Sequence, residues 1–143
     1  METHKRIIIR TDGGARGNPG PAAIGVVIEL SDGSRRKEYG EQIGNTTNNV
    51  AEYKAVVFGL KKAKHLFGKD RENLEAEVRS DSELIISQLN GLYKMKDAEL
   101  FPFFIEIWNL RQDFKGVKFV HVPREENKEA DRLVNQALDT LGI

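Results

Sequence analysis

The sequence contains no cysteine. This absence excludes a disulfide framework, a zinc site built on thiolates and a cysteine nucleophile. No apolar run comes near the roughly 20 residues that a helix needs to span a membrane. The first residues, Met1 to Arg6, lead straight into a strand pattern without the apolar core of a signal peptide. We therefore expect a cytoplasmic protein with no membrane partner.

The sequence also has no excess of positive or negative charge, because 22 basic residues balance 22 acidic ones. A net charge of zero excludes a strongly basic protein that coats nucleic acid. It leaves room for a nucleic-acid enzyme, because metal ions can neutralise an acidic centre and present positive charge to phosphate. Non-specific affinity for nucleic acid should be modest and sensitive to salt.

Internal repeats, low-complexity tracts and linkers are absent as well. The chain has 143 residues, the usual size of one domain and enough for a hydrophobic core. We expect a single domain over residues 1–143, and a monomer.

The apolar pattern predicts an α/β fold. Strands are expected at Ile7 to Asp12, Ala22 to Leu30, Ser34 to Ile43, Glu75 to Ser80 and Val117 to Val122, with a glycine-rich loop at Gly13 to Pro21. Helices are expected from the capping cluster Thr46 to Asn49 as far as about Phe67, and at Ser82 to Asn90, Asp97 to Phe114 and Lys128 to Leu141. The order β-β-β-α-β-α-α-β-α indicates a five-stranded mixed sheet with helices on both faces.

Four acidic residues occupy positions that such a fold could bring together. Asp12 closes the first strand and Asp81 follows the fourth, and α/β folds form sites at the carboxyl ends of strands. Glu52 lies in the first turn of one helix and Asp131 early in another. Clustered carboxylates would bind hard divalent cations such as Mg²⁺, and two such ions can catalyse phosphodiester displacement. Without metal, repulsion between the carboxylates should raise at least one pKa.

Each acid also has an ordinary explanation when it is taken alone. Asp12 could belong to a turn, and Glu52 could complete a capping box by accepting a hydrogen bond from the Asn49 amide. Asp81 could cap the following helix, and Asp131 could be a charge on a solvated helix face.

Longer segments around these acids point to a family. Four of them closely resemble the signatures of ribonuclease H type 1: Thr11 to Pro21, Thr46 to Glu52, Ser80 to Ser82, and His121 to Asp131. The resemblance runs through nearly the whole chain in the right order. It implies the ribonuclease H-like fold, two Mg²⁺ or Mn²⁺ ions per site, and hydrolysis of the RNA strand of an RNA–DNA hybrid to 5′-phosphate and 3′-hydroxyl ends.

The resemblance also implies roles for individual residues. The metal-binding carboxylates would be Asp12, Glu52, Asp81 and Asp131. Contacts to the minor groove and backbone of the hybrid would come from Gly13, Gly14, Asn18, Asn48 and Asn49, and a phosphate pocket for the DNA strand from Thr47 and Asn18. Glycine lets backbone amides approach nucleic acid closely, and asparagine both donates and accepts hydrogen bonds. The alternative for these loop residues is turn and cap chemistry.

Two departures from the bacterial pattern stand out. Many bacterial members carry a lysine-rich helix and loop that grips the hybrid, whereas here Gly91 to Glu99 is too short and only mildly basic. The chain therefore resembles the branch without this handle, which includes archaeal-type members. Tyr93, Lys94 and Lys96 could substitute weakly for the handle, or they could form a solvated connection.

The second departure concerns the group that assists turnover. Bacterial relatives use a loop histidine, but His121 lies in a strand pattern, where histidine is more often structural. Arg124 falls in the connecting loop and resembles the arginine of archaeal-type members. Because arginine cannot act as a general base, we expect Arg124 to contact phosphate or product.

Three other functions remain open on the sequence. The chain could be a non-catalytic nucleic-acid-binding module of the same fold, although such a binder gains nothing from clustered negative charge beside phosphate. It could be a structural domain in which the four acids lie far apart. It could also be a relative that acts on DNA or on double-stranded RNA.

Overall fold

A five-stranded mixed sheet forms the centre of the protein. A computed structural model describes residues 5–142, and the first few residues, on which the signal-peptide expectation largely rests, lie outside the described range. The strands follow the order β3-β2-β1-β4-β5 across the sheet, with bounds Arg6–Ala15 (β1), Gly20–Leu30 (β2), Lys37–Thr46 (β3), Glu75–Ser80 (β4) and Gly116–His121 (β5). Strands β1, β2 and β3 pair antiparallel, whereas β1, β4 and β5 pair parallel. The predicted mixed sheet is confirmed.

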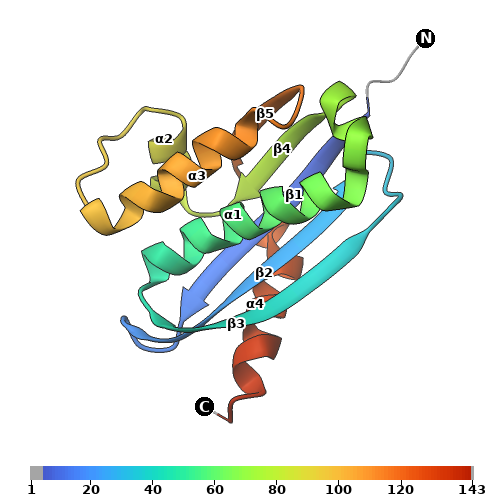
Figure 1. The fold of residues 1–143 in the computed structure, drawn as a ribbon. Helices are drawn as coiled ribbons and strands as arrows, with labels where there is room; N and C mark the ends of the chain where they lie inside the picture. Colours follow the sequence, from blue (N-terminus) through green and yellow to red (C-terminus); the bar gives the residue numbers. More distant parts are fainter. Residues whose placement is uncertain (1–4, 143) are drawn as a thin grey trace.

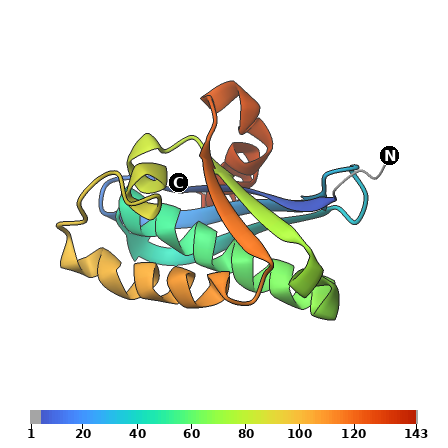
Figure 2. The ribbon, with the colours of Figure 1, turned by 90° about the horizontal axis from the view of Figure 1, so that it is seen from above.

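Helices cover both faces of the sheet, as the sequence predicts. They are Asn48–Phe67 (α1), Glu83–Leu89 (α2), Phe101–Arg111 (α3) and Lys128–Asp139 (α4), joined by the short 3-10 helices Gly68–Asn73 (η1), Ala98–Leu100 (η2) and Arg124–Glu126 (η3). Helices α1 and α3 lie side by side on one face, and α4 crosses the opposite face (Figures 1 and 2). Within residues 5–142, none of the helices combines the length and the apolar character needed to cross a lipid bilayer.

Burial on both faces explains the composition of the central strand. Ile7, Ile8 and Ile9 of β1 are at most 4% exposed, because α1 and α4 each cover one side of β1 and β2. A strand covered on both sides has no need of polar alternation. The row of apolar residues predicted for the first helix is also buried: Val56, Leu60, Ala63 and Phe67.

Several boundaries differ from the predictions. The third strand begins at Lys37, not at Ser34, because Arg35 has a φ of 56° and cannot continue an extended backbone. The predicted glycine loop is shorter, since β1 continues to Ala15 and β2 starts at Gly20. The long third helix is split into η2 and α3, and α3 starts beside Pro102, which has no amide hydrogen to donate. The last helix ends at Asp139.

Candidate metal and nucleic-acid site

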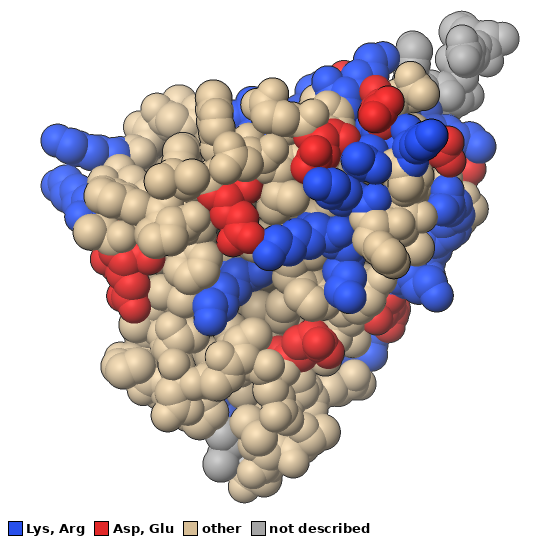
Figure 3. Space-filling model, in the orientation of Figure 1, with Lys and Arg blue, Asp and Glu red and all other residues tan. Residues whose placement is uncertain are grey.

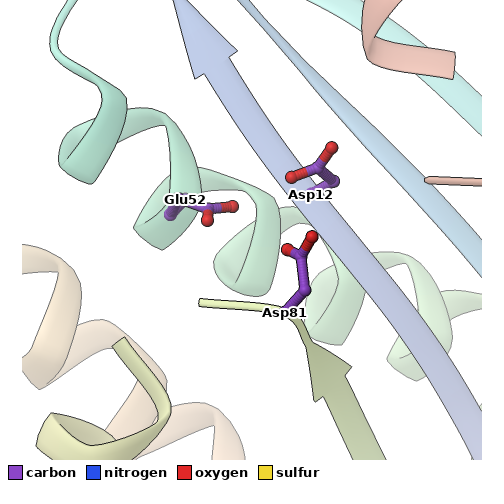
Figure 4. A group of neighbouring side chains, drawn as sticks. All are labelled: Asp12, Glu52 and Asp81. Carbon is purple, nitrogen blue, oxygen red and sulfur yellow. The ribbon is translucent and has the colours of Figure 1, made fainter. Parts of the chain in front are cut away.

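Three of the predicted carboxylates converge at one place in the fold. Oxygen atoms of Asp12, Glu52 and Asp81 all lie within 4.8 Å of one another, and the three side chains point toward one another from β1, α1 and the end of β4 (Figure 4). This proximity excludes the alternative in which these acids lie far apart. It also fits the oxygen donors that a hard divalent cation takes.

The pairing of β1 with its two neighbours explains where Asp12 lies. The last parallel pair between β1 and β4 is Arg10 with Arg79, whereas β1 stays paired with β2 as far as Ala15. The sequence indicated that Asp12 ends its strand, but β1 continues past it to Ala15. Asp12 lies just beyond the point where β1 and β4 separate, and Asp81 follows the end of β4. The opening between two parallel strands is where α/β sheets form sites.

Glu52 is positioned by a close approach of α1 to β1. Its Oε1 accepts a hydrogen bond of 2.7 Å from the backbone amide of Gly13. A side chain at position 13 would overlap the backbone of Ala51, so only glycine allows this approach. The N-cap of α1 is Thr47, whose hydroxyl accepts from the Val50 amide at 3.2 Å. The capping-box explanation of Glu52 is therefore wrong, because its carboxylate contacts β1 instead of the Asn49 amide.

Asp81 is likewise not a cap. The residue that caps α2 is Ser82, whose hydroxyl accepts from the Ile85 amide at 3.3 Å. This leaves the Asp81 carboxylate, 18% exposed, directed toward the other acids and toward Arg124, whose Nε lies 4.0 Å away.

Asp131 stands at the edge of the cluster. It lies in the first turn of α4, on the face of the sheet opposite α1, and it lines the same cleft as the other three acids. It is outside the group of three whose oxygens fall within 4.8 Å. Its carboxyl group is close enough to Asp12 to interact with it through charge and through a hydrogen bond between the two side chains.

The electrostatics of the cluster are those of buried acids held close together. Burial, followed by the charges of Asp81 and Asp131, raises the pKa of Asp12 from its ordinary 3.8 to about 7. Burial and the neighbouring charge of Asp12 also raise the pKa of Glu52 well above its ordinary value. Bringing buried carboxylates together is unfavourable unless they are protonated or bind a cation. The donor set therefore fits a divalent metal ion.

The residues predicted to contact nucleic acid lie beside the carboxylates. Gly13, Gly14 and Asn48 line the cleft, which encloses about 570 Å³. Asn18 and Asn48 also serve the structure: the Asn18 Oδ1 accepts from the Asn48 amide at 3.0 Å, and the Asn48 Oδ1 accepts from the Ala15 amide at 2.8 Å. Both bonds hold the β1–β2 turn against the start of α1. Asn18 and Asn48 thus also make the turn contacts that were the alternative to substrate binding, and Thr47 caps α1.

The two candidates for assisting turnover occupy different environments. Arg124 begins η3, its side chain is 87% exposed, and it lines the cleft. His121 ends β5, paired with Ser80, as its strand pattern predicted, and it is not among the residues that line the cleft. Reasoning from the sequence missed further lining residues, among them Arg16 and Asn135. Asn135 is an exposed helix residue, and no sequence motif around it indicates a functional role.

The sequence profile of the Reverse transcriptase-like family matches residues 10–137. Among curated relatives, the bifunctional protein Rv2228c of Mycobacterium tuberculosis is 39% identical over 94% of this chain and 36% of its own length. The Ribonuclease HI of Halobacterium salinarum is 42% identical over 90% of this chain and 62% of its own length. The chain thus spans less than two thirds of these relatives.

Among solved structures, LC11-RNase H1, isolated from compost, is 48% identical and superimposes with a TM-score of 0.90. The match covers 96% of this chain and 99% of that protein. LC11-RNase H1 has also been solved in complex with an RNA/DNA hybrid.

Proposed function

Because the chain belongs to the ribonuclease H type 1 family, we propose that it is a metal-dependent endonuclease that hydrolyses the RNA strand of RNA–DNA hybrids, leaving 5′-phosphate and 3′-hydroxyl ends. The observation that carries the proposal is the convergence of Asp12, Glu52 and Asp81 within 4.8 Å. The hybrid-bound structure of LC11-RNase H1 supports the choice of substrate.

The carboxylates would hold the metal ions. Asp12, Glu52 and Asp81 would bind Mg²⁺ or Mn²⁺, and Asp131, at the edge of the group, would take part in a second position once substrate phosphate is present. Cations bound there supply an activated water and stabilise the charge of the leaving oxygen. The repulsion that raises the pKa of Asp12 would be relieved by the same binding.

The chain's own residues would hold and orient the hybrid. The backbone of Gly13 and Gly14 borders the cleft, and it would approach the hybrid there. Asn48 and Asn49 are exposed at the start of α1, and with Asn18 and Thr47 they would contact the minor groove and a phosphate of the DNA strand. Arg124, exposed beside Asp81, would bind the scissile phosphate or the product, since it cannot accept a proton.

Binding should depend on few cationic contacts. On the face covered by α1 and α3, basic side chains lie among acidic ones and other residues (Figure 3). Lys94 and Lys96 are exposed in the short segment between α2 and α3 and would replace the missing handle only weakly. The expected cytoplasmic location and monomeric state stay predictions from the sequence.

A cleavage assay tests the proposal directly. Labelled RNA–DNA hybrid, single-stranded RNA, double-stranded RNA and DNA are incubated with the protein, with and without Mg²⁺ or Mn²⁺. We expect cleavage of the RNA strand of the hybrid only with metal, and a loss of at least about a thousandfold in rate for Asp12→Asn. Slower cleavage of double-stranded RNA would reveal the side activity considered above. Hybrid binding without any metal-dependent cleavage would instead identify a non-catalytic module, and equal rates for wild type and Asp12→Asn would reject the assigned site.

A further inference from the structure

Asn127 is a buried polar residue at the start of α4 that does not act as a helix cap. It is 1% exposed and occupies the N-cap position, yet its side chain makes no capping hydrogen bond. Asparagine is common at this position because its side-chain oxygen accepts from a free amide in the first turn. Here the side chain turns away from the helix, and its Nδ2 donates a hydrogen bond of 2.9 Å to the carbonyl of Thr11. The residue thus bonds to β1 immediately before Asp12.

The backbone of Asn127 connects the other parts of the site. Its carbonyl accepts from the amide of Asp131 at 3.1 Å, and its amide donates to the carbonyl of Arg124 at 2.9 Å. One residue therefore links the strand that carries Asp12 with the helix turn that carries Asp131 and with the loop that carries Arg124. The loop and the helix turn are neighbours in the sequence, whereas Thr11 of β1 is 116 residues away from Asn127. Helix α4 lies on the opposite face of the sheet from α1, which carries Glu52.

The orientation of the Asn127 side chain carries a cost in stability. The Oδ1 of Asn127 is buried and has no hydrogen-bond partner among residues 5–142, and an unsatisfied buried acceptor costs roughly 1–3 kcal/mol. The orientation of the amide is determined by Thr11, whose carbonyl can only accept and must therefore face Nδ2. Asparagine thus keeps its bond to β1 although it neither caps its helix nor pairs its own oxygen. An apolar residue here would remove the unpaired Oδ1, but it would also take the donor from the Thr11 carbonyl.

The first turn of α4 also packs directly against the sheet. A side chain at Gly25 would overlap the carbonyl of Ala130, so the first turn of α4 already rests on β2. Gly25 pairs with Asp12 across the sheet, so this packing places the turn that carries Asp131 opposite Asp12, and the side chain of Asn127 adds a direct bond to β1 itself. The bond from Asn127 to Thr11 thus joins the start of α4 to the strand that carries Asp12.

We propose that Asn127 is a positioning residue that sets the separation of Asp12 and Asp131 and thereby the affinity of the cluster for divalent cations. The inference rests on the proposed function only in assigning these carboxylates to a metal. Residues that orient the ligands of a metal, without touching it, typically change metal affinity or activity by 10-fold to 100-fold when they are replaced.

The test compares two replacements that differ in volume. Asn127→Leu keeps the space filled and removes the unpaired oxygen, whereas Asn127→Ala leaves a cavity and should have the lower melting temperature. Both remove the bond to Thr11. We expect the affinity for Mn²⁺, measured by titration calorimetry on the free protein, to fall about tenfold or more in both variants, independently of their melting temperatures. In the cleavage assay kcat should fall, while KM for the hybrid changes little, since Asn127 does not line the cleft.

Asn90→Leu provides the matched control. Asn90 ends α2 and donates from Nδ2 to the carbonyl of Phe119 at 3.0 Å, so it is also a side-chain tether from a helix end to a strand. Its replacement should lower the melting temperature and leave Mn²⁺ affinity unchanged.

Three results would overturn the positioning role. These are wild-type Mn²⁺ affinity in folded Asn127 variants, an equal loss of affinity in Asn90→Leu, and failure of both Asn127 variants to fold, which would make the tether a purely structural bond. A wild-type protein that binds Mn²⁺ but does not cleave the hybrid would count against the proposed function and not against the role of Asn127.

Discussion

At the scale of single residues, Asp12 couples the stability of the protein to the chemistry of its site. Its carboxyl group is 9% exposed, and burial with the charges of Asp81 and Asp131 raises its pKa to about 7. A carboxyl group with a raised pKa binds its proton more tightly in the folded than in the unfolded protein. Its contribution to stability is therefore complete below about pH 4 and is lost as the pH rises through about 7. Glu52 shifts in the same direction.

The pH dependence of metal-free unfolding measures this coupling. In the presence of a chelator, Asp12→Asn should become progressively more stable than the wild type between about pH 4 and pH 8. The difference should approach at most about 4 kcal/mol, the equivalent of a shift of about three pKa units. Urea unfolding of both proteins across this range gives the difference directly. A difference that is independent of pH would contradict the raised pKa, and Mg²⁺ should abolish the slope of the wild type alone.

We expect substitutions of Arg124 and of His121 to differ in their effect on kcat. Arg124 lines the cleft beside Asp81, and His121 does not. We expect Arg124→Ala to lower kcat about tenfold or more, in line with the loss of a charge-assisted contact to phosphate, and His121→Ala to change it less than about twofold. Single-turnover and steady-state cleavage rates of both variants provide the comparison. The reverse order would show that the histidine assists turnover.

At the scale of elements, the sequence predicted the order of strands and helices and the helices on both faces, because apolar periodicity reports burial. It did not predict how β1 changes neighbours. Asp12 looked like a strand end, although β1 runs on to Ala15, because the sequence cannot show that β4 stops pairing at Arg10 while β2 continues. The roles of Glu52 and Asp81 were ambiguous for a similar reason: a cap and a ligand share the same local pattern, and only the positions of Thr47 and Ser82 decide between them.

The contact between α1 and β1 at Gly13 is the element-scale feature that places Glu52. A Cβ atom at position 13 would lie 2.6 Å from the Glu52 amide nitrogen and overlap Ala51. Gly13→Ala should therefore move α1 away from β1, with a loss of about 1–3 kcal/mol in the free energy of unfolding and a loss of metal affinity. Chemical denaturation and Mn²⁺ titration report the two effects.

Gly116→Ala is the control for this substitution. The nearest atom to a Cβ at that position is the Cγ of Glu75 at 3.9 Å, an ordinary contact, so stability and metal affinity should both stay near wild type. If Gly13→Ala behaves like Gly116→Ala, then the close approach of α1 to β1 does not position Glu52.

At the scale of the whole molecule, the balance of charge sets how the substrate is held. The chain has no net charge, and basic and acidic side chains interleave over the face of α1 and α3 (Figure 3). The acidic centre itself repels phosphate until cations bind. Affinity for the hybrid should thus depend on metal and on a few direct contacts more than on a general attraction to nucleic acid.

The salt dependence of hybrid binding tests this picture. Each phosphate neutralised in a duplex contributes roughly 0.9 to the slope of log K against log salt concentration. We expect a slope of magnitude about 4 or less, measured by fluorescence anisotropy with Asp12→Asn and Ca²⁺ to prevent cleavage. Lys94→Ala with Lys96→Ala should reduce it by roughly 1–2 if these exposed lysines reach the hybrid. Lys115→Ala with Lys118→Ala removes the same charge around the amino-terminal end of β5, the end away from the carboxylates, and should leave the slope unchanged. A wild-type slope near 8 or above would mean that an extended cationic surface binds the hybrid despite the balanced charge. The short α2–α3 connection would then not weaken substrate binding.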